Sequence, residues 1–240
     1  MATVTKGDLI ELDVEKFADE GQSLARVDGY VVFVEGAVPG DRVKAYVHST
    51  KSNYAEAKLD TLLEPSDLRT EPRCRYADEC GGCKWQFLQY ERQLAYKQQH
   101  VEEALQHIGQ LTGIPVHAPI PSEKIFGYRN KMEFSCSDRR WLLPEELGDP
   151  EIGKSFALGL HTPGTFDKIL DIDACLLHPE KGNRILNDVR DYMKASDQPP
   201  YGLRTHEGFW RFLMLRHSVA YDQWLVNLIT AEDRPQAVEP

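Results

Sequence analysis

The sequence lacks any long hydrophobic run. In its 240 residues the longest uninterrupted apolar stretch runs from Tyr30 to Val34 and ends at Glu35, well short of the ~18 residues that a membrane-spanning helix needs. The first residues contain no basic segment followed by an apolar one, so we expect no secretory signal. Hydrophobic residues still make up 41% of the chain, which excludes a disordered chain. We therefore expect a folded cytoplasmic protein without a membrane partner, with a monomer as the default.

Positive charge is also in short supply. The chain has 28 lysine and arginine residues against 38 acidic ones, and a formal net charge of −10. This balance argues against a uniformly basic nucleic-acid-binding protein. The charge is uneven, however, because residues 124–141 contain five basic side chains and only two acidic ones. The sequence is therefore compatible with a local basic face on an acidic protein.

Short alternating segments dominate the first 65 residues. Apolar and polar residues alternate along 10–14, 43–48 and 55–60, as they do in half-buried strands. Asp28-Gly29 is a strong hairpin signal between two further strands. Five short strands in so short a segment predict a small closed barrel of the OB type, which hides its own strand edges.

The rest of the chain mixes helices and strands. Apolar residues at helical spacing predict a helix from about 88 to 108. Alternation along 128–136 predicts a strand, and 185–193 is expected to be helical. The apolar runs 212–219 and 224–230 predict an antiparallel hairpin buried on both faces. The resulting fold class is mixed, with an OB-like β-barrel at 1–65, a cysteine loop and helix at 66–113, and an α+β domain at 114–240.

Three of the five cysteines, Cys74, Cys80 and Cys83, stand within ten residues, and two glycines separate the last pair. Adjacent glycines give a loop that can adopt positive φ, so the sulfurs can converge on one centre. The backbone N–H groups of such a loop can stabilise metal-bound thiolates. Cys175 follows a short alternating strand and is the natural fourth ligand.

Other interpretations of the cysteines are weaker. A structural zinc site usually has two short cysteine hairpins, whereas here one gap is five residues and the fourth cysteine is distant. A redox Cys-x-x-Cys pair needs a thioredoxin-like βαβ context, which the pattern does not show. An iron–sulfur cluster is favoured, and zinc stays open as the alternative. Cys136 shares a strand face with Met132 and Phe134, so it is expected to be a buried core thiol.

The order of these features resembles a known family. The barrel, the motif Cys-x5-Cys-Gly-Gly-Cys-Lys-Trp-Gln at 74–86 and the following helix resemble the iron–sulfur-containing RNA (uracil-5-)-methyltransferases, the 23S rRNA type in particular. The segment Tyr-Arg-Asn-Lys-Met-Glu-Phe at 128–134 is similar to a strand of that family's central RNA-binding domain. The hairpin that begins at 213–217 is similar to the one that leads into its catalytic domain. Residues 138–158 look like an additional loop.

This resemblance implies a domain, two cofactors and an RNA partner. The barrel would be a TRAM domain, and a 4Fe-4S cluster would be held by Cys74, Cys80, Cys83 and Cys175. The RNA would be 23S rRNA rather than tRNA, and S-adenosylmethionine (SAM) would supply the methyl group. The candidate RNA contacts are basic or aromatic residues of the barrel, the cysteine segment and the central strand. They are Arg42, Lys44, Lys84, Trp85, Arg129 and Lys131.

The glycine-rich turn with which such enzymes bind SAM is missing. No Gly-x-Gly occurs in these 240 residues, and the family's late Asp-Pro-Pro and catalytic-cysteine motifs are absent too. We therefore expect the chain to be the N-terminal, RNA-binding part of such an enzyme or a truncated gene product, inactive by itself, with a structural cluster. A stand-alone iron–sulfur RNA-binding module without catalysis is the alternative. A radical-SAM methylthiotransferase fits poorly, because its cysteine spacing and the position of its TRAM domain differ.

Overall fold

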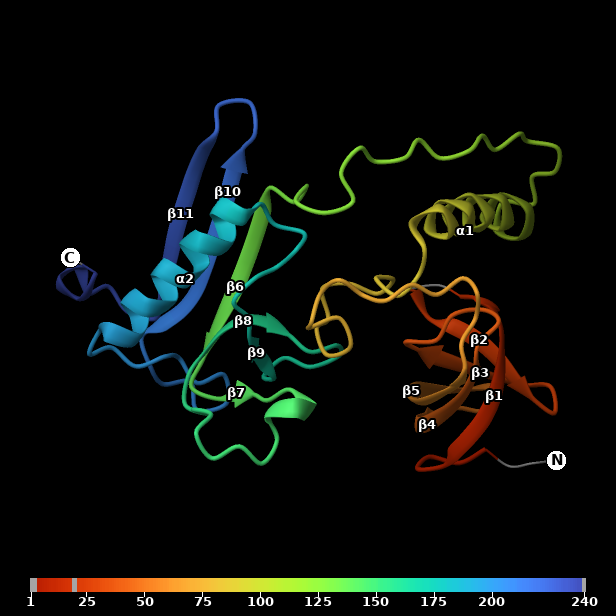
Figure 1. Cartoon of the computed structure of the whole chain (residues 1–240), viewed down its shortest axis with the longest axis horizontal. Helices are drawn as coiled ribbons and strands as arrows, with labels where there is room; N and C mark the ends of the chain where they lie inside the picture. Colours follow the sequence, from red (N-terminus) through yellow and green to blue (C-terminus); the bar gives the residue numbers. More distant parts are fainter. Residues whose placement is uncertain (1–3, 19–20, 239–240) are drawn as a thin grey trace. The chain divides into compact units, whose positions relative to one another are not determined.

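The computed structural model describes residues 4–18 and 21–238, which divide into two compact units (Figure 1). Unit 1 comprises the described residues up to Arg75 together with residues 83–122, and unit 2 comprises residues 76–82 and those from Glu123 onward. Unit 1 contains β1 (Leu9–Phe17), β2 (Ser23–Val27), β3 (Tyr30–Glu35), β4 (Arg42–Thr50), β5 (Tyr54–Glu64), the helix α1 (Tyr90–Glu103) and the π-helical turn η2 (Ala104–Ile108). Unit 2 contains β6 (Lys131–Ser137), β7 (Arg140–Trp141), η3 (Pro144–Glu146), β8 (Ala157–His161), β9 (Ile169–Asp171), α2 (Glu180–Ala195), β10 (Trp210–Ser218), β11 (Gln223–Thr230) and η4 (Pro235–Ala237).

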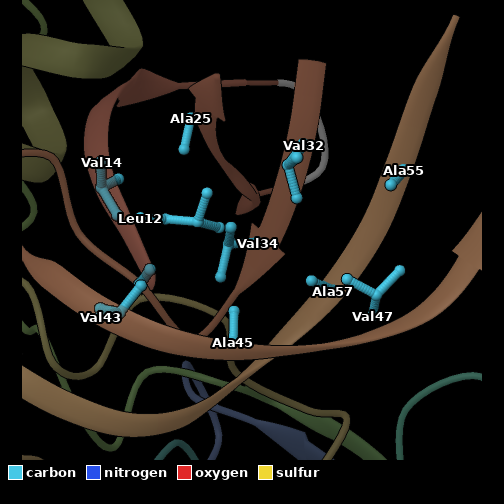
Figure 2. Close-up of a cluster of buried hydrophobic side chains, with 11 residues drawn as sticks. Leu12, Val14, Ala25, Val32, Val34, Val43, Ala45, Val47, Ala55 and Ala57 are labelled. Atoms are coloured by element: carbon cyan, nitrogen blue, oxygen red, sulfur yellow. The ribbon is translucent and has the colours of Figure 1, made fainter. Parts of the chain in front are cut away.

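The first five strands close into a barrel in the order β1-β2-β3-β5-β4, which confirms the predicted OB-like barrel. The parallel pairing of β3 with β5 completes the closure. Asp28 and Gly29 both have positive φ, 49° and 86°, as the tight turn between β2 and β3 requires. The inward-facing side chains are almost all valine or alanine, and Figure 2 shows them pointing toward one another inside the barrel. Small side chains suit this position because a five-stranded barrel encloses little space.

A buried ion pair ties the segment after the barrel to its strands. The Asp41 carboxylate is fully buried and accepts hydrogen bonds from the Val38 and Ser66 N–H groups at 2.7 and 2.9 Å. Arg69 binds the same carboxylate with two nitrogens and donates to the Gly36 carbonyl at 2.8 Å. Both oxygens of this buried carboxylate therefore accept hydrogen bonds. A buried ion pair is tolerated when its polar atoms are satisfied in this way.

Unit 2 is built on a six-stranded sheet in the order β11-β10-β6-β8-β9-β7. In Figure 1, α2 runs along the sheet beside β10, and its Leu186 and Met193 are buried. Buried residues of β6 and β10, including the directly opposite Phe134 and Leu213, belong to the core of this unit.

One arginine joins α2 to strands β8 and β9 of the sheet. Arg190 is 7% exposed, and its Nε lies 3.0 Å from Oδ1 of Asp171 in β9. Its Nη2 donates to the Leu158 carbonyl at 2.9 Å and also to the Ile172 carbonyl. This charge is therefore paired and hydrogen-bonded to both neighbouring strands, as a buried guanidinium must be.

Two expectations for unit 2 are wrong. The hairpin of β10 and β11 forms as predicted, but it is not buried on both faces, because β11 is the edge strand and its Leu225 and Val226 are 52% and 46% exposed. Residues 138–158 are not simply an added loop, since they include β7, which pairs in parallel with β9. Both differences arise from pairings between distant segments, which local alternation does not encode. In the described part of the chain, no helix is long and apolar enough to span a membrane.

Candidate functional site

The loop that carries Cys80 is anchored within unit 2. The Tyr76 hydroxyl donates to the Asp173 carboxylate at 2.6 Å and accepts from the Asp173 N–H at 3.2 Å. The Gly81 N–H donates to the His161 carbonyl at 2.9 Å. A Cβ on Gly81 would lie only 3.0 Å from that carbonyl oxygen, so glycine permits the close approach. These contacts fix the loop to the sheet and to the segment just before Cys175.

Cys175 lies at the other end of that anchored segment and is 9% exposed. Its N–H donates to Oδ1 of Asn183 at 3.0 Å, and its carbonyl accepts from the Asn183 amide at 3.2 Å. A second residue, His178, donates its backbone N–H to the same carbonyl at 3.0 Å. The backbone around Cys175 is therefore held by Asn183 in the first turn of α2 and by His178 just before the helix.

The chemistry of the four cysteines fits an iron–sulfur cluster, since such clusters are held by four thiolates that accept backbone hydrogen bonds. The Gly82 N–H already lies 3.4 Å from the Cys80 sulfur, in the direction of such a bond. Cys74 and Cys83 belong to unit 1, and Cys80 and Cys175 to unit 2. Across residues 4–18 and 21–238, no three His, Cys, Asp or Glu side chains are gathered to hold a metal ion. Convergence of the four thiols therefore stays a prediction.

Cys136 is a separate case. It is 1% exposed on β6, beside Met132 and Phe134. Burial raises the pKa of its thiol to about 12, although hydrogen bonds from the Ser137 and Tyr201 backbone oppose the shift. The expected position of Cys136 as a buried core thiol is confirmed.

Two of the candidate RNA contacts, Arg42 and Lys44, lie on β4 of the barrel beside carboxylates. Arg42 bonds to Glu11 at 3.1 Å and to Glu64 at 3.3 Å, and these partners raise the pKa of its guanidinium. Lys44 stands opposite Glu11 in the pairing of β4 with β1. Both positive charges therefore already have negative neighbours, so a phosphate would have to compete with these carboxylates.

Two further candidates, Lys84 and Trp85, pack against the barrel. The Trp85 indole N–H donates to the Gly21 carbonyl at 3.3 Å, and the ring lies 5.2 Å from that of Phe17. Lys84 is exposed, but the stem of its side chain passes beside Gly21. Trp85 thus has a packing role, and one part of its ring surface remains accessible.

The last two candidates, Arg129 and Lys131, are exposed at the start of β6. The Arg129 N–H donates to the Leu177 carbonyl at 2.8 Å, which holds this backbone beside the start of α2. Lys131 stands directly opposite Arg216 of β10, which is also exposed. Sequence reasoning overlooked Arg216, because only the strand register shows that it shares a face with Lys131.

Comparison with known proteins settles what the barrel is. Residues 3–59 match the family model of the TRAM domain. The barrel is a TRAM domain. The five strands of the closed barrel lie within residues 1–65, the segment for which the resemblance implied such a domain.

The chain is also similar to several bacterial proteins over most of its own length. It is 42% identical to a protein of Chlorobaculum tepidum named an uncharacterized RNA methyltransferase, over 94% of this chain and 48% of that protein. A protein of Bacteroides thetaiotaomicron with the same description is 43% identical over 84% of this chain and 44% of its own length. The chain thus spans about half the length of the curated relatives it matches.

A solved structure has the same fold. The crystal structure of Pyrococcus abyssi tRNA (uracil-54, C5)-methyltransferase in complex with S-adenosyl-L-homocysteine matches 93% of this chain and 46% of that chain, with a TM-score of 0.66. The sequence identity is 21%, so this likeness shows a shared fold alone. That these residues have no methyltransferase activity by themselves stays a prediction.

Proposed function

We propose that this chain is the RNA-recognition and iron–sulfur portion of a SAM-dependent RNA (uracil-5-)-methyltransferase that acts on 23S rRNA. The observation that carries the proposal is the 42% identity, over nearly the whole chain, to a protein named an RNA methyltransferase. The TRAM barrel supports RNA as the partner, because OB-type barrels bind single-stranded or looped nucleic acid. The uracil C5 position and 23S rRNA both come from the resemblance of the cysteine motif, and the name of the structural neighbour supports the C5 position.

In this proposal the chain positions the RNA, and none of its described residues takes part in methyl transfer. A base that reacts at a ring carbon must leave its stack before an enzyme can reach it. The protein must therefore hold the neighbouring nucleotides in an unstacked conformation. The exposed pair Lys131 and Arg216 offers phosphate-binding charge in unit 2, and the TRAM domain with its aromatic neighbour Trp85 offers a surface for bases in unit 1.

We further propose that Cys74, Cys80, Cys83 and Cys175 hold a 4Fe-4S cluster with a structural role. When bound, the cluster would cross-link segments that are distant in the sequence. The anchoring of Tyr76 to Asp173 supports this role, because it fixes the Cys80 loop beside the segment that ends at Cys175. The buried backbone of Cys175 supplies a rigid attachment point.

A gene deletion tests the proposed reaction. RNA from a strain that lacks the gene for this chain should lose 5-methyluridine from 23S rRNA and keep it in tRNA, as measured by mass spectrometry of nuclease digests. Reintroducing the unaltered gene should restore the modification. Loss from tRNA alone would overturn the choice of 23S rRNA. Unchanged 5-methyluridine in both RNAs would overturn the methyltransferase proposal and favour an RNA-binding module without catalysis.

A further inference from the structure

Unit 1 contains a cavity of about 360 Å³ next to the TRAM barrel. It is lined by the end of β1, by Gly21 and Trp85, and by one face of α1 that includes Tyr96, Lys97 and His100. Its volume lies near the lower end of the ~300–1,000 Å³ typical of small-ligand pockets. A single nucleotide therefore matches its size better than a folded segment of RNA or protein.

Three aromatic rings form the wall of this cavity. The Phe17 ring lies 4.4 Å from that of Tyr96 at an interplanar angle of 82°, and 5.2 Å from that of Trp85 at 44°. All three side chains are only partly buried, so ring surface remains for a ligand. The hydrogen bond from the Trp85 indole to Gly21 fixes the ring in place. A wall of positioned aromatic rings is the arrangement on which unstacked bases stack, with little dependence on base identity.

Lys97 places a positive charge at the cavity that can meet an anionic group of a ligand. Lys97 is exposed at the cavity, and its ammonium can reach a group that enters there. Among the lining residues that the structure describes, the acidic one is Glu103, which accepts a hydrogen bond from the Gln99 amide at 2.9 Å and so is partly satisfied within α1. A base against the rings and its phosphate near Lys97 would use both features together.

We propose that this cavity binds one unstacked base of a single-stranded RNA segment, with the adjoining phosphate held by Lys97. This inference rests on the proposed function, because the comparisons connect the chain to RNA. The proposed base-binding position is formed jointly by the TRAM domain and α1. Of its residues, the sequence motifs indicated Trp85 alone.

Photo-crosslinking and affinity measurements on the 240-residue chain test the proposal. The probe is a fluorescein-labelled single-stranded RNA of about 12 nucleotides, the length range that such grooves cover, with 5-iodouridine at successive positions. Crosslinks should map to peptides that contain Trp85 or Tyr96. In fluorescence anisotropy, Tyr96→Leu should weaken binding about tenfold, because the loss of one stacked base has that effect. Tyr96→Phe, which keeps the ring, should restore most of the affinity.

Lys97→Gln provides a test that does not depend on core packing, since Lys97 is exposed. It should weaken binding about threefold and lower the salt dependence by about one phosphate contact. Lys154→Gln, a substitution at an exposed position of unit 2, is the matched control and should change neither quantity.

Two results would overturn the proposal in distinguishable ways. If the RNA binds but crosslinks map elsewhere, and both Tyr96→Leu and Lys97→Gln bind normally, the cavity is not a base site and the proposed function stands. If the unaltered chain binds no RNA, the cavity proposal fails together with the assigned RNA-recognition role.

Discussion

At the scale of single residues, Gly21 sets how closely the Cys83–Trp85 segment approaches the barrel. Its φ is +76°, and a Cβ there would lie 2.9 Å from Nε1 of Trp85. Gly113 has the same φ of +76°, but a Cβ there would meet no atom within 4 Å. Alanine substitution at Gly113 therefore measures the free-energy cost of the left-handed backbone alone. The same substitution at Gly21 adds the cost of the close contact with Trp85.

Gly113→Ala should lower the free energy of unfolding by about 1 kcal/mol, the cost of a left-handed conformation with a Cβ. Gly21→Ala should lower it by about 2–3 kcal/mol, because the Trp85 indole must also shift. Urea titration monitored by tryptophan fluorescence measures both changes. Equal losses in the two variants would show that the contact between Gly21 and Trp85 contributes nothing.

The reactivity of Cys136 follows from its raised pKa. With a thiol pKa of about 12, only about one molecule in ten thousand carries the thiolate at pH 8, and the thiolate is the form that alkylates. We expect iodoacetamide at pH 8 to leave Cys136 unmodified in the folded chain and to modify it in guanidinium chloride. Peptide mass spectrometry measures the labelling. Modification of Cys136 at the unfolded rate in the folded chain would contradict its buried position.

At the scale of secondary-structure elements, the register of β6 and β10 creates a basic pair that neither strand has alone. Lys131 and Arg216 stand directly opposite each other, and both are exposed. Cβ atoms of directly opposite residues lie ~5 Å apart, so the two charges can contact the same phosphate or adjacent ones. The sequence showed Lys131 within a basic segment, but it gave no reason to join Arg216 to it.

Replacing either member of this pair should weaken RNA binding without changing stability. Lys131→Gln and Arg216→Gln should each reduce affinity about three- to tenfold and reduce the salt slope by about one. Lys154→Gln, at an exposed position of the same unit, is the control and should have no effect. Fluorescence anisotropy at several salt concentrations measures these changes. Wild-type affinity in both variants would remove this pair from the RNA surface.

The attachment of α2 to the sheet depends on Asp171, which neutralises the buried Arg190. Asp171→Asn should lower the free energy of unfolding by about 3 kcal/mol, because it leaves a buried guanidinium without its counter-charge. Glu232→Gln removes the carboxylate of an exposed pair with Arg234 and should cost less than about 1 kcal/mol. Thermal unfolding followed by circular dichroism compares the two. Similar effects of both substitutions would show that Arg190 is well solvated in the folded chain.

At the scale of the whole molecule, local patterns predicted the elements better than their pairings. The Asp28-Gly29 turn and the alternation along β4 and β5 were enough to predict the barrel, because each strand buries one face. Nothing local shows that β3 pairs in parallel with β5, or that β11 lies at the edge of its sheet. These features depend on contacts between segments far apart in the chain.

In the candidate sites too, the sequence predicted local features but not the contacts between distant segments. Spacing and glycine content singled out the three clustered cysteines, since metal ligands must lie close together. Sequence reasoning named Trp85 as an RNA contact, but its partners Phe17 and Tyr96 come from a strand and a helix whose association only the fold shows. The carboxylates beside Arg42 could not be predicted from the sequence either, because Glu64 lies next to Arg42 only through the pairing of β4 with β5.

The cysteine set is the central claim, because it joins the sequence motif to the proposed family. The most direct measurement is an assay of iron, acid-labile sulfide and zinc on the anaerobically purified chain and on two variants, Cys175→Ser and Cys136→Ser. We predict about four irons and four sulfides per chain, lost in Cys175→Ser and retained in Cys136→Ser, whose thiol is buried apart from the proposed ligands. One zinc per chain without iron or sulfide, or a cluster that survives Cys175→Ser, would contradict the account.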